Sequence, residues 1–218
     1  MADPLGLTTF AVEKGYFWSA RPEGVRFGAV GEGDEYALND YTAVFSSSSI
    51  FTGVPESLSD NFFKLLLEDI DAEIDDGMVY TSCSNEFSKD IFFMFAGNWL
   101  QIRAQDLIVD ISEAQDGTLC AVTFIPTTND YWWFGHNIYK DYYVIHNMSK
   151  RTLGFVPTLD NLKGEIMDGA KPVSSFPSYN WIMMLVKLGV GAVWAVGIWV
   201  LIDYGFKPAS FTGINFLN

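Results

Sequence analysis

The hydrophobic and polar positions of this chain define three kinds of segment. In the first, apolar residues recur at helical spacing with Ser57 or Ser59 available as a cap, which predicts a helix over residues 58–74; the apolar positions are Leu58, Phe62, Leu65, Leu66 and Ile70. The second is a strand-rich stretch at 90–109, DIFFMFAGNWLQIRAQDLIV. The third is an almost unbroken apolar run at 181–202. The first two are typical of a globular core, and the third is typical of a membrane helix.

The apolar run, WIMMLVKLGVGAVWAVGIWVLI, comprises 22 residues with one charge. At about 1.5 Å per residue such a helix crosses a hydrocarbon core of about 30 Å. We therefore predict a single C-terminal transmembrane helix over residues 181–203, followed by a tail over 204–218. Residues 159–180 carry Gly, Pro and Ser and are predicted to form a linker to this anchor.

Three residues of the predicted helix are candidates for contacts with another subunit. Gly191 and Ala195 form a small-xxx-small pair that lets a second helix approach closely, although glycine is also common in membrane helices in general. Lys187 lies about two turns inside the apolar run. Its ammonium group either snorkels to the nearer interface or pairs with a carboxylate of a neighbouring subunit, and both alternatives stay open.

Composition and charge limit what the rest of the chain can be. With 218 residues, 49% hydrophobic and 16% aromatic, the chain can bury one sizeable core, so we expect one globular domain. The net charge of -14 argues against a nucleic-acid partner, because no basic stripe exists to neutralise phosphates. The acidic residues concentrated at 68–76 form either a solvated face or a patch that docks a basic partner subunit.

Four motifs occur in a recognisable order and spacing. Residues 15–28 contain GYFWSA and VRFG, and residues 43–55 read AVFSSSSIFTGVP. Cys83 and Cys120 enclose the strand-rich stretch, and residues 133–157 contain WFGHNI, DYYVI and RTLGFVP. Together these motifs resemble the C-terminal lobe of a pepsin-like eukaryotic aspartic protease.

The resemblance implies a mainly β fold for the globular part. We expect a single pepsin-like lobe of antiparallel sheets with one or two short helices over residues 15–158, preceded by an N-terminal extension over 1–14. Cys83 and Cys120 fall at the family's disulfide positions, so the resemblance implies a bridge, with reduced core cysteines as the alternative. A bridge of this span stabilises a fold by roughly 3 to 4 kcal/mol and points to an oxidising compartment.

The same resemblance places a serine where the family has a catalytic aspartate. Read without gaps, Ser46 occupies that position, and the degenerate loop consists of Ser46, Ser47, Ser48 and Ser49. Proteolysis by this family needs two carboxylates that share one proton across a water, a role that a serine hydroxyl cannot fill. Residues 1–42 are too few for the family's first lobe. We therefore expect no catalytic residue in this chain and no protease activity.

The remaining candidate residues are weaker. His136 and His146 have no metal-ligand cluster around them, and the serine run lacks a His-Asp pair or a nucleophile elbow. The tripeptide that begins at Asn147 matches a glycosylation acceptor, but such tripeptides often arise by chance. We therefore expect no metal and no cofactor.

These patterns favour a non-catalytic pseudo-protease that serves as a membrane-anchored accessory subunit of a larger membrane complex. Its partners would be the other subunits and the lipid bilayer. The alternative is a membrane-tethered module that binds peptides or proteins without cleaving them. In that case its groove would be lined by the serine run and by Trp132 and Trp133.

Localisation follows from the predicted anchor and bridge. The N-terminal residues, MADPLGLTTFAVEKG, carry no signal-peptide pattern. With a disulfide and a C-terminal anchor, we expect the mitochondrial inner membrane, with the lobe in the intermembrane space, and a respiratory-chain complex or the ATP synthase as the assembly. A glycan on Asn147 would instead indicate a membrane of the secretory pathway.

Overall fold

The computed structural model of the chain describes residues 7–13, 15, 17–28, 33–111, 119–158 and 164–176. All of these belong to one compact unit, Met1–Ser178. Within these described ranges, no helix is long and apolar enough to cross a bilayer. The transmembrane helix predicted over 181–203, with Lys187, Gly191 and Ala195, and the tail over 204–218 lie outside the described residues.

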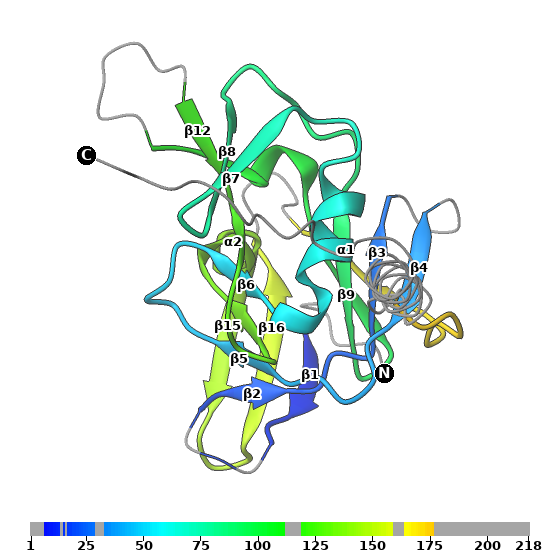
Figure 1. Cartoon of the computed structure of the whole chain (residues 1–218). Coiled ribbons are helices and arrows are strands. Elements are labelled where there is room, and N and C mark those ends of the chain that lie inside the picture. The colour runs from blue at the N-terminus through cyan, green and yellow to red at the C-terminus, as the bar shows by residue number, and fades with distance from the viewer. Residues whose placement is uncertain are drawn as a thin grey trace, which may run out of the picture. The chain divides into compact units, whose positions relative to one another are not determined.

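Two five-stranded sheets are the largest sheets of the described part of the chain (Figure 1). One runs in the order β17 (Ile166–Asp168), β10 (Asn98–Ile102), β9 (Ile91–Phe95), β3 (Gly24–Phe27) and β4 (Asp34–Ala37). The other runs in the order β13 (Phe124–Pro126), β6 (Thr52–Val54), β14 (Trp132–Phe134), β5 (Ala43–Phe45) and β2 (Ser19–Ala20).

Two smaller sheets and three short helical segments complete the described part. The four-stranded sheet has the order β11 (Ile108–Asp110), β12 (Leu119–Val122), β8 (Met78–Ser82) and β7 (Ala72–Asp75). The three-stranded sheet has the order β1 (Thr8–Ala11), β16 (Thr152–Pro157) and β15 (Tyr142–Asn147). The helical segments are α1 (Glu56–Leu66), α2 (His136–Asp141) and the 3-10 turn η1 (Ala104–Asp106). The predicted mainly β fold with few helices is confirmed.

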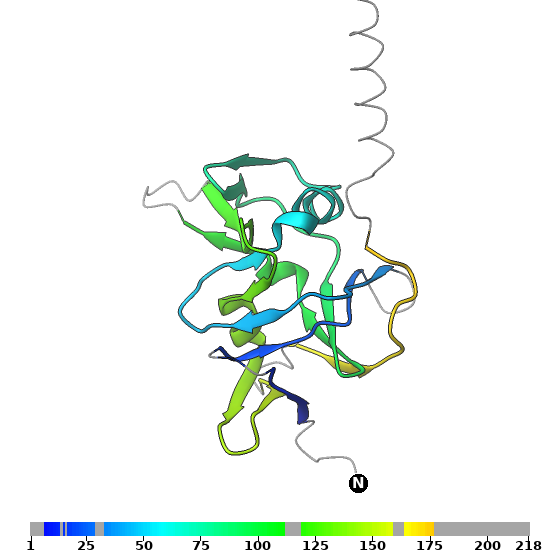
Figure 2. The ribbon, with the colours of Figure 1, turned by 60° about the horizontal axis from the view of Figure 1, so that its bottom comes forward.

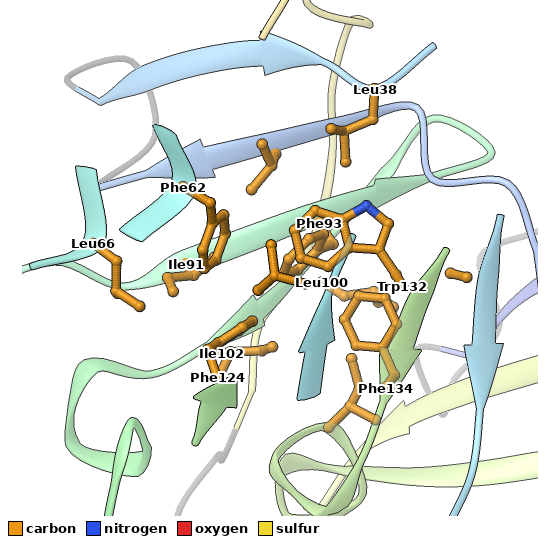
Figure 3. Close-up of a cluster of buried hydrophobic side chains, with 14 of the residues drawn as sticks. Leu38, Phe62, Leu66, Ile91, Phe93, Leu100, Ile102, Phe124, Trp132 and Phe134 are labelled. Atoms are coloured by element: carbon orange, nitrogen blue, oxygen red, sulfur yellow. The ribbon is translucent and has the colours of Figure 1, made fainter. Parts of the chain in front are cut away.

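Aromatic side chains fill the centre of the core. Trp132 and Phe134 point to the same side of β14, as alternate residues of a strand do. Their ring centroids lie 4.9 and 4.8 Å from that of Phe93 on β9 (Figure 3). Phe62 of α1 closes the cluster, 5.3 Å from the Trp132 ring. These edge-on contacts match the charge distribution of aromatic rings and fix the helix against both five-stranded sheets.

Helix α1 is shorter than the helix predicted over residues 58–74, because it ends at Leu66. The acidic residues that follow would meet the negative end of the helix dipole. In addition, Asp76 and Gly77 have φ angles of 45° and 76°, the backbone of a two-residue hairpin turn, which draws the preceding residues into β7. The helix predicted from the apolar spacing is correct as far as Leu66. Beyond Leu66, the turn at residues 76–77 favours a strand instead.

The residues on both sides of the predicted lobe belong to the fold. Strand β1, within the predicted N-terminal extension, pairs with β16 from Thr8↔Phe155 to Ala11↔Thr152. At the other end, residues 164–176, predicted as part of a linker, pack onto the first five-stranded sheet; we call them the strap. Sequence composition could not separate a free linker from this segment, because Gly, Pro and Ser are typical of both and the contacts of the segment are with residues distant in the chain.

The strap crosses one face of the sheet, where it appears as the yellow to gold segment (Figure 2). Its β17 extends the sheet at β10, with Met167 opposite Trp99. At the far edge, Ala37 donates a backbone hydrogen bond of 2.6 Å to Ser174, and Phe176 packs 5.1 Å from the ring of Tyr36. The strap therefore forms one edge strand of the sheet, β17, and is bonded to the strand at the opposite edge, β4.

A buried arginine lies in the layer that the strap covers. The Arg26 guanidinium is 4.1 Å from the centroid of the Trp99 ring and 5.6 Å from that of Phe92. Its Nε lies 2.7 Å from Oε1 of Glu35 on the neighbouring strand. A charge removed from water needs a partner of this kind, and the two rings add cation–π attraction. The strap thus closes a layer that is both aromatic and charged.

We expect Gly169→Leu to detach the strap, because a side chain at residue 169 would overlap with the buried Trp99 ring. Overpacking of this kind destabilises a core by about 1 to 3 kcal/mol. Urea unfolding of the full chain in detergent, followed by tryptophan fluorescence, measures the change. Gly15→Leu is the matched control, since no described atom lies within 4 Å of a Cβ added there. Equal stability of the two variants would contradict this account of the strap.

Candidate functional site

The serine loop, residues 46–51, connects β5 to β6 and is the candidate site. Strand β14 lies between these two strands, parallel to β5 and antiparallel to β6. The backbone N–H of Ser46 donates to the carbonyl of Phe134 at 3.0 Å, and that of His136 donates to the carbonyl of Ser49 at 2.8 Å. Both ends of the loop are therefore bonded to the segment that leaves β14.

Gly135 is the residue that allows this close crossing. A Cβ at this position would overlap with the carbonyl oxygen of Phe51. Its backbone N–H donates to Thr52 Oγ1 at 3.2 Å, and Thr52 Oγ1 donates to Asn137 Oδ1 at 2.6 Å. Thr52 and Asn137 are buried, so these bonds form in an environment where they are strong. The loop is held on a rigid base.

The loop itself presents hydroxyl groups. Ser46 Oγ and Ser48 Oγ are 2.9 Å apart, and Ser49 Oγ donates to the carbonyl of Phe51 at 2.7 Å. Ser47 and Ser48 are exposed, and Ser46 and Ser49 are half-buried. Among the described residues, no hydrogen bond joins a carboxylate or an imidazole to a loop hydroxyl. A serine acts as a nucleophile only with an adjacent base, and another hydroxyl is not one.

The binding-module alternative predicts that the two adjacent tryptophans line one groove. In the structure they do not. Trp132 is fully buried in the core, whereas Trp133 is half-buried on the opposite face of β14. Successive residues of a strand point to opposite faces, so only one member of such a pair can line a surface. Trp133 borders a hollow of about 440 Å³ together with Val44, its partner on β5.

The predicted disulfide between Cys83 and Cys120 is confirmed. It joins Cys83, directly after β8, to Cys120 in β12, and so links the two central strands of the four-stranded sheet. Asp110 lies beside the two sulfur atoms, but sulfurs bonded to each other are not available as thiolate ligands for a metal. A polar hollow of about 670 Å³ adjoins the bridge, with Asp90 and Gln101 among its lining residues.

A buried charge cluster connects α2 to the turn that follows β10. Nη2 of Arg103 lies 3.1 Å from Oδ1 of Asp141 and also contacts Asp106, which in turn contacts Nζ of Lys140. Asp141 is fully buried and Asp106 is nearly so. Burial, reinforced by the neighbouring Asp106 carboxylate, raises the pKa of Asp141 to about 6, although Arg103 opposes the shift. Sequence reasoning missed this cluster, because its members are far apart along the chain.

The two histidines lie on different elements. His136 begins α2, and His146 lies in β15, where its ring packs 4.8 Å from that of Trp18. Partial burial lowers the pKa of His146. Asn147 ends β15, and its Oδ1 accepts hydrogen bonds from Ser149 Oγ and from the backbone N–H of Lys150, which shapes the hairpin. These contacts give each residue a structural role.

The mainly β fold, with β14 between β5 and β6 and a polar loop at their ends, is consistent with one lobe of an aspartic protease. A family model for eukaryotic aspartyl proteases matches residues 6–158. The chain therefore belongs to the eukaryotic aspartyl protease family. No curated protein matches the chain. The family match also includes β1, in agreement with its place in the three-stranded sheet.

We expect Asp141→Asn to flatten the dependence of stability on pH. The pKa of Asp141 is raised from 3.8 to about 6 in the fold, so the folded state holds the proton more tightly than the unfolded chain. Stability from this group is therefore greatest below pH 4 and falls as the pH rises to about 6, by roughly 1 to 3 kcal/mol.

Urea unfolding between pH 4 and pH 7 measures the difference between the two proteins. The wild type should lose stability relative to Asp141→Asn over this interval. The exposed turn variant Asp76→Asn makes the same chemical change elsewhere and should run parallel to the wild type. Parallel curves for all three proteins would show that Asp141 does not titrate in this range.

Proposed function

We propose that this protein is a non-catalytic pseudo-protease that serves as an accessory subunit of a larger membrane complex, anchored by the helix predicted at 181–203. The observation that carries the proposal is the chemistry of the serine loop. The resemblance of residues 43–55 to the family's aspartate loop puts Ser46 at the position of the catalytic aspartate. In the structure the Ser46 hydroxyl lies 2.9 Å from that of Ser48, on a loop held by buried hydrogen bonds.

The loss of the carboxylate has a direct consequence for catalysis. Aspartic proteases activate water between two carboxylates whose mutual repulsion keeps one proton between them. A serine neither holds a negative charge nor removes a proton from water at physiological pH. A second lobe on a separate chain would bring one carboxylate only, so the pair would stay incomplete.

An exposed apolar face supports a role in assembly. On the three-stranded sheet, Tyr143 and Ile145 of β15 point outward with 69% and 36% of their surface exposed, and Met148 at the hairpin is 78% exposed. Leu7 and Ile145 meet over Gly154 in the centre of the same face. Apolar side chains gathered on one face are typical of a protein–protein contact.

The proposed location is the mitochondrial inner membrane, with the lobe in the intermembrane space. The Cys83–Cys120 bridge supports an oxidising compartment. The assembly would be a respiratory-chain complex or the ATP synthase. A peptide- or protein-binding module is the second candidate, and the hollow bordered by Trp133 and Val44 favours it.

We expect neither the wild-type chain nor the Ser46→Asp variant to cleave peptides. One restored carboxylate lacks the partner that shares its proton, so the rate should equal that of buffer. A quenched fluorescent peptide library assayed from pH 3 to pH 7 measures this. Ser47→Asp is the matched control for the added charge, and an active pepsin-like enzyme is the positive control. Wild-type cleavage that a transition-state analogue of aspartic proteases blocks would overturn the non-catalytic assignment.

We expect the tagged chain, extracted in mild detergent, to migrate on a native gel in one large complex with stoichiometric partner subunits. Ile145→Asp places a charge on the exposed face and should reduce recovery of the partners at least tenfold, which corresponds to about 1.4 kcal/mol. Ile74→Asp, at an exposed apolar residue of β7, is the matched control and should retain the partners. Migration of the wild-type chain alone would refute the accessory role.

A further inference from the structure

Cys83, Asp110 and Cys120 lie on one face of the four-stranded sheet. Asp110 of β11 is the register partner of Cys120 of β12, and Cys120 is the register partner of Thr81 of β8. Residues directly opposite each other on neighbouring strands share a face. Cys83 comes two residues after Thr81 and continues the alternation on the same side. The two sulfur atoms and a carboxylate oxygen of Asp110 therefore lie within 4.8 Å of one another.

All three side chains line the polar hollow of about 670 Å³ that adjoins the bridge. Cys83 is half-buried, whereas Cys120 is buried, so a small molecule in the hollow reaches the bridge from the side of Cys83. Exchange of a disulfide with a thiol depends on such access to one of its sulfurs. Asp110 is exposed at the same hollow. The bridge is thus open to reduction at a place where a carboxylate stands beside it.

The three donor groups match the requirements of zinc. Zn²⁺ binds thiolate sulfur at about 2.3 Å and carboxylate oxygen at about 2.0 to 2.2 Å, in a tetrahedral arrangement that places two sulfurs about 3.8 Å apart. The Cα atoms of Cys83 and Cys120 are 5.0 Å apart, so rotation of the side chains supplies this separation once the bond between them is broken. Ca²⁺ and Mg²⁺ take oxygen ligands, so a pair of sulfurs selects against them.

We propose that reduction of the Cys83–Cys120 bridge creates a zinc site in which both thiolates and the Asp110 carboxylate bind the ion. A small monothiol attacks the Cys83 sulfur and displaces Cys120, and a second monothiol then displaces Cys83. The two monothiols supply two electrons and two protons and leave as their own disulfide. Zinc then displaces one proton from each cysteine thiol, because the thiolate is the metal ligand. The fourth position faces the hollow, where water completes the tetrahedron.

The bridge and the zinc site exclude each other, because both use the same two sulfurs. Each of them links β8 to β12, and the zinc form adds β11 through Asp110. Zinc therefore restores a cross-link that reduction removes. In an oxidising compartment the bridge persists, so the zinc form belongs to reducing conditions. The inference goes beyond the proposed function and does not depend on the accessory role.

The test adds cobalt(II) chloride and then zinc chloride to the full chain in detergent, with and without prior treatment with a phosphine reductant. Cobalt(II) reports on the ligands of a zinc site, since thiolates give it charge-transfer absorption and a tetrahedral site gives it strong visible bands. We expect these bands with the reduced chain, their loss when zinc is added, and no such bands with the oxidised chain. Near-ultraviolet circular dichroism of the same samples reports whether the reduced chain is folded.

A matched pair of variants separates a ligand from a bystander. Asp110 and Glu86 are both exposed carboxylates of the same hollow, but only Asp110 lies beside the two sulfurs. Asp110→Asn should weaken zinc binding by about tenfold or more, since it removes a ligand. Glu86→Gln removes the same charge from the same hollow and should change the affinity by less than about twofold.

Four results would overturn the inference. The first is the absence of cobalt–thiolate absorption after reduction, and the second is metal binding of equal strength by the oxidised chain, which would assign the ion to surface carboxylates. The third is equal weakening by Asp110→Asn and Glu86→Gln. The fourth is a reduced chain that stays unfolded in the presence of zinc. None of these results changes the outcome of the native purification, so the two proposals are tested separately.

Discussion

The passage of β14 between β5 and β6 is the constraint on which the rest of the structure depends. It requires a residue without a side chain at Gly135, because the carbonyl of Phe51 occupies the space that a Cβ would need. Successive side chains of a strand point to opposite faces, so the position of β14 also determines where its side chains lie. Trp132 and Phe134 enter the core, and Trp133 lies on the opposite surface. One backbone crossing therefore determines the core, the position of the serine loop and the wall of the hollow.

The same crossing explains how the serine loop keeps its shape whichever side chain stands at position 46. The bonds that hold the loop run through backbone groups and the buried Thr52 and Asn137 side chains. None of them involves the side chain of Ser46, so the residue at that position is free to change without loss of the fold. The fold therefore does not depend on the chemistry of the side chain at this position.

Much of the fold could be predicted from the sequence, because local signals and family motifs agree along most of it. The disulfide and the strand-rich stretch belong to this part. Three features of the fold were missed. The turn at Asp76 and Gly77 ends the helix early, although its dipeptide was a readable signal. The strap and the Arg103–Asp141 cluster depend on partners distant in sequence, which periodicity does not reveal. Trp132 and Trp133 show a further limit. Adjacent residues of a strand lie on opposite faces, so each must be placed on a face before a role is predicted for it.

Charge is distributed in two ways in this acidic lobe, and the difference separates structural from functional candidates. Inside, the buried Asp106 and Asp141 lie against Arg103, and the half-buried Glu35 lies against the buried Arg26, because a buried charge must be paired or neutralised. On the surface, most acids need no partner charge, since water solvates them. Asp40 and Asp130 belong to this second group, because both are exposed to solvent. The buried acids therefore serve the fold, and only the solvated acids of the surface are available for contacts with another molecule.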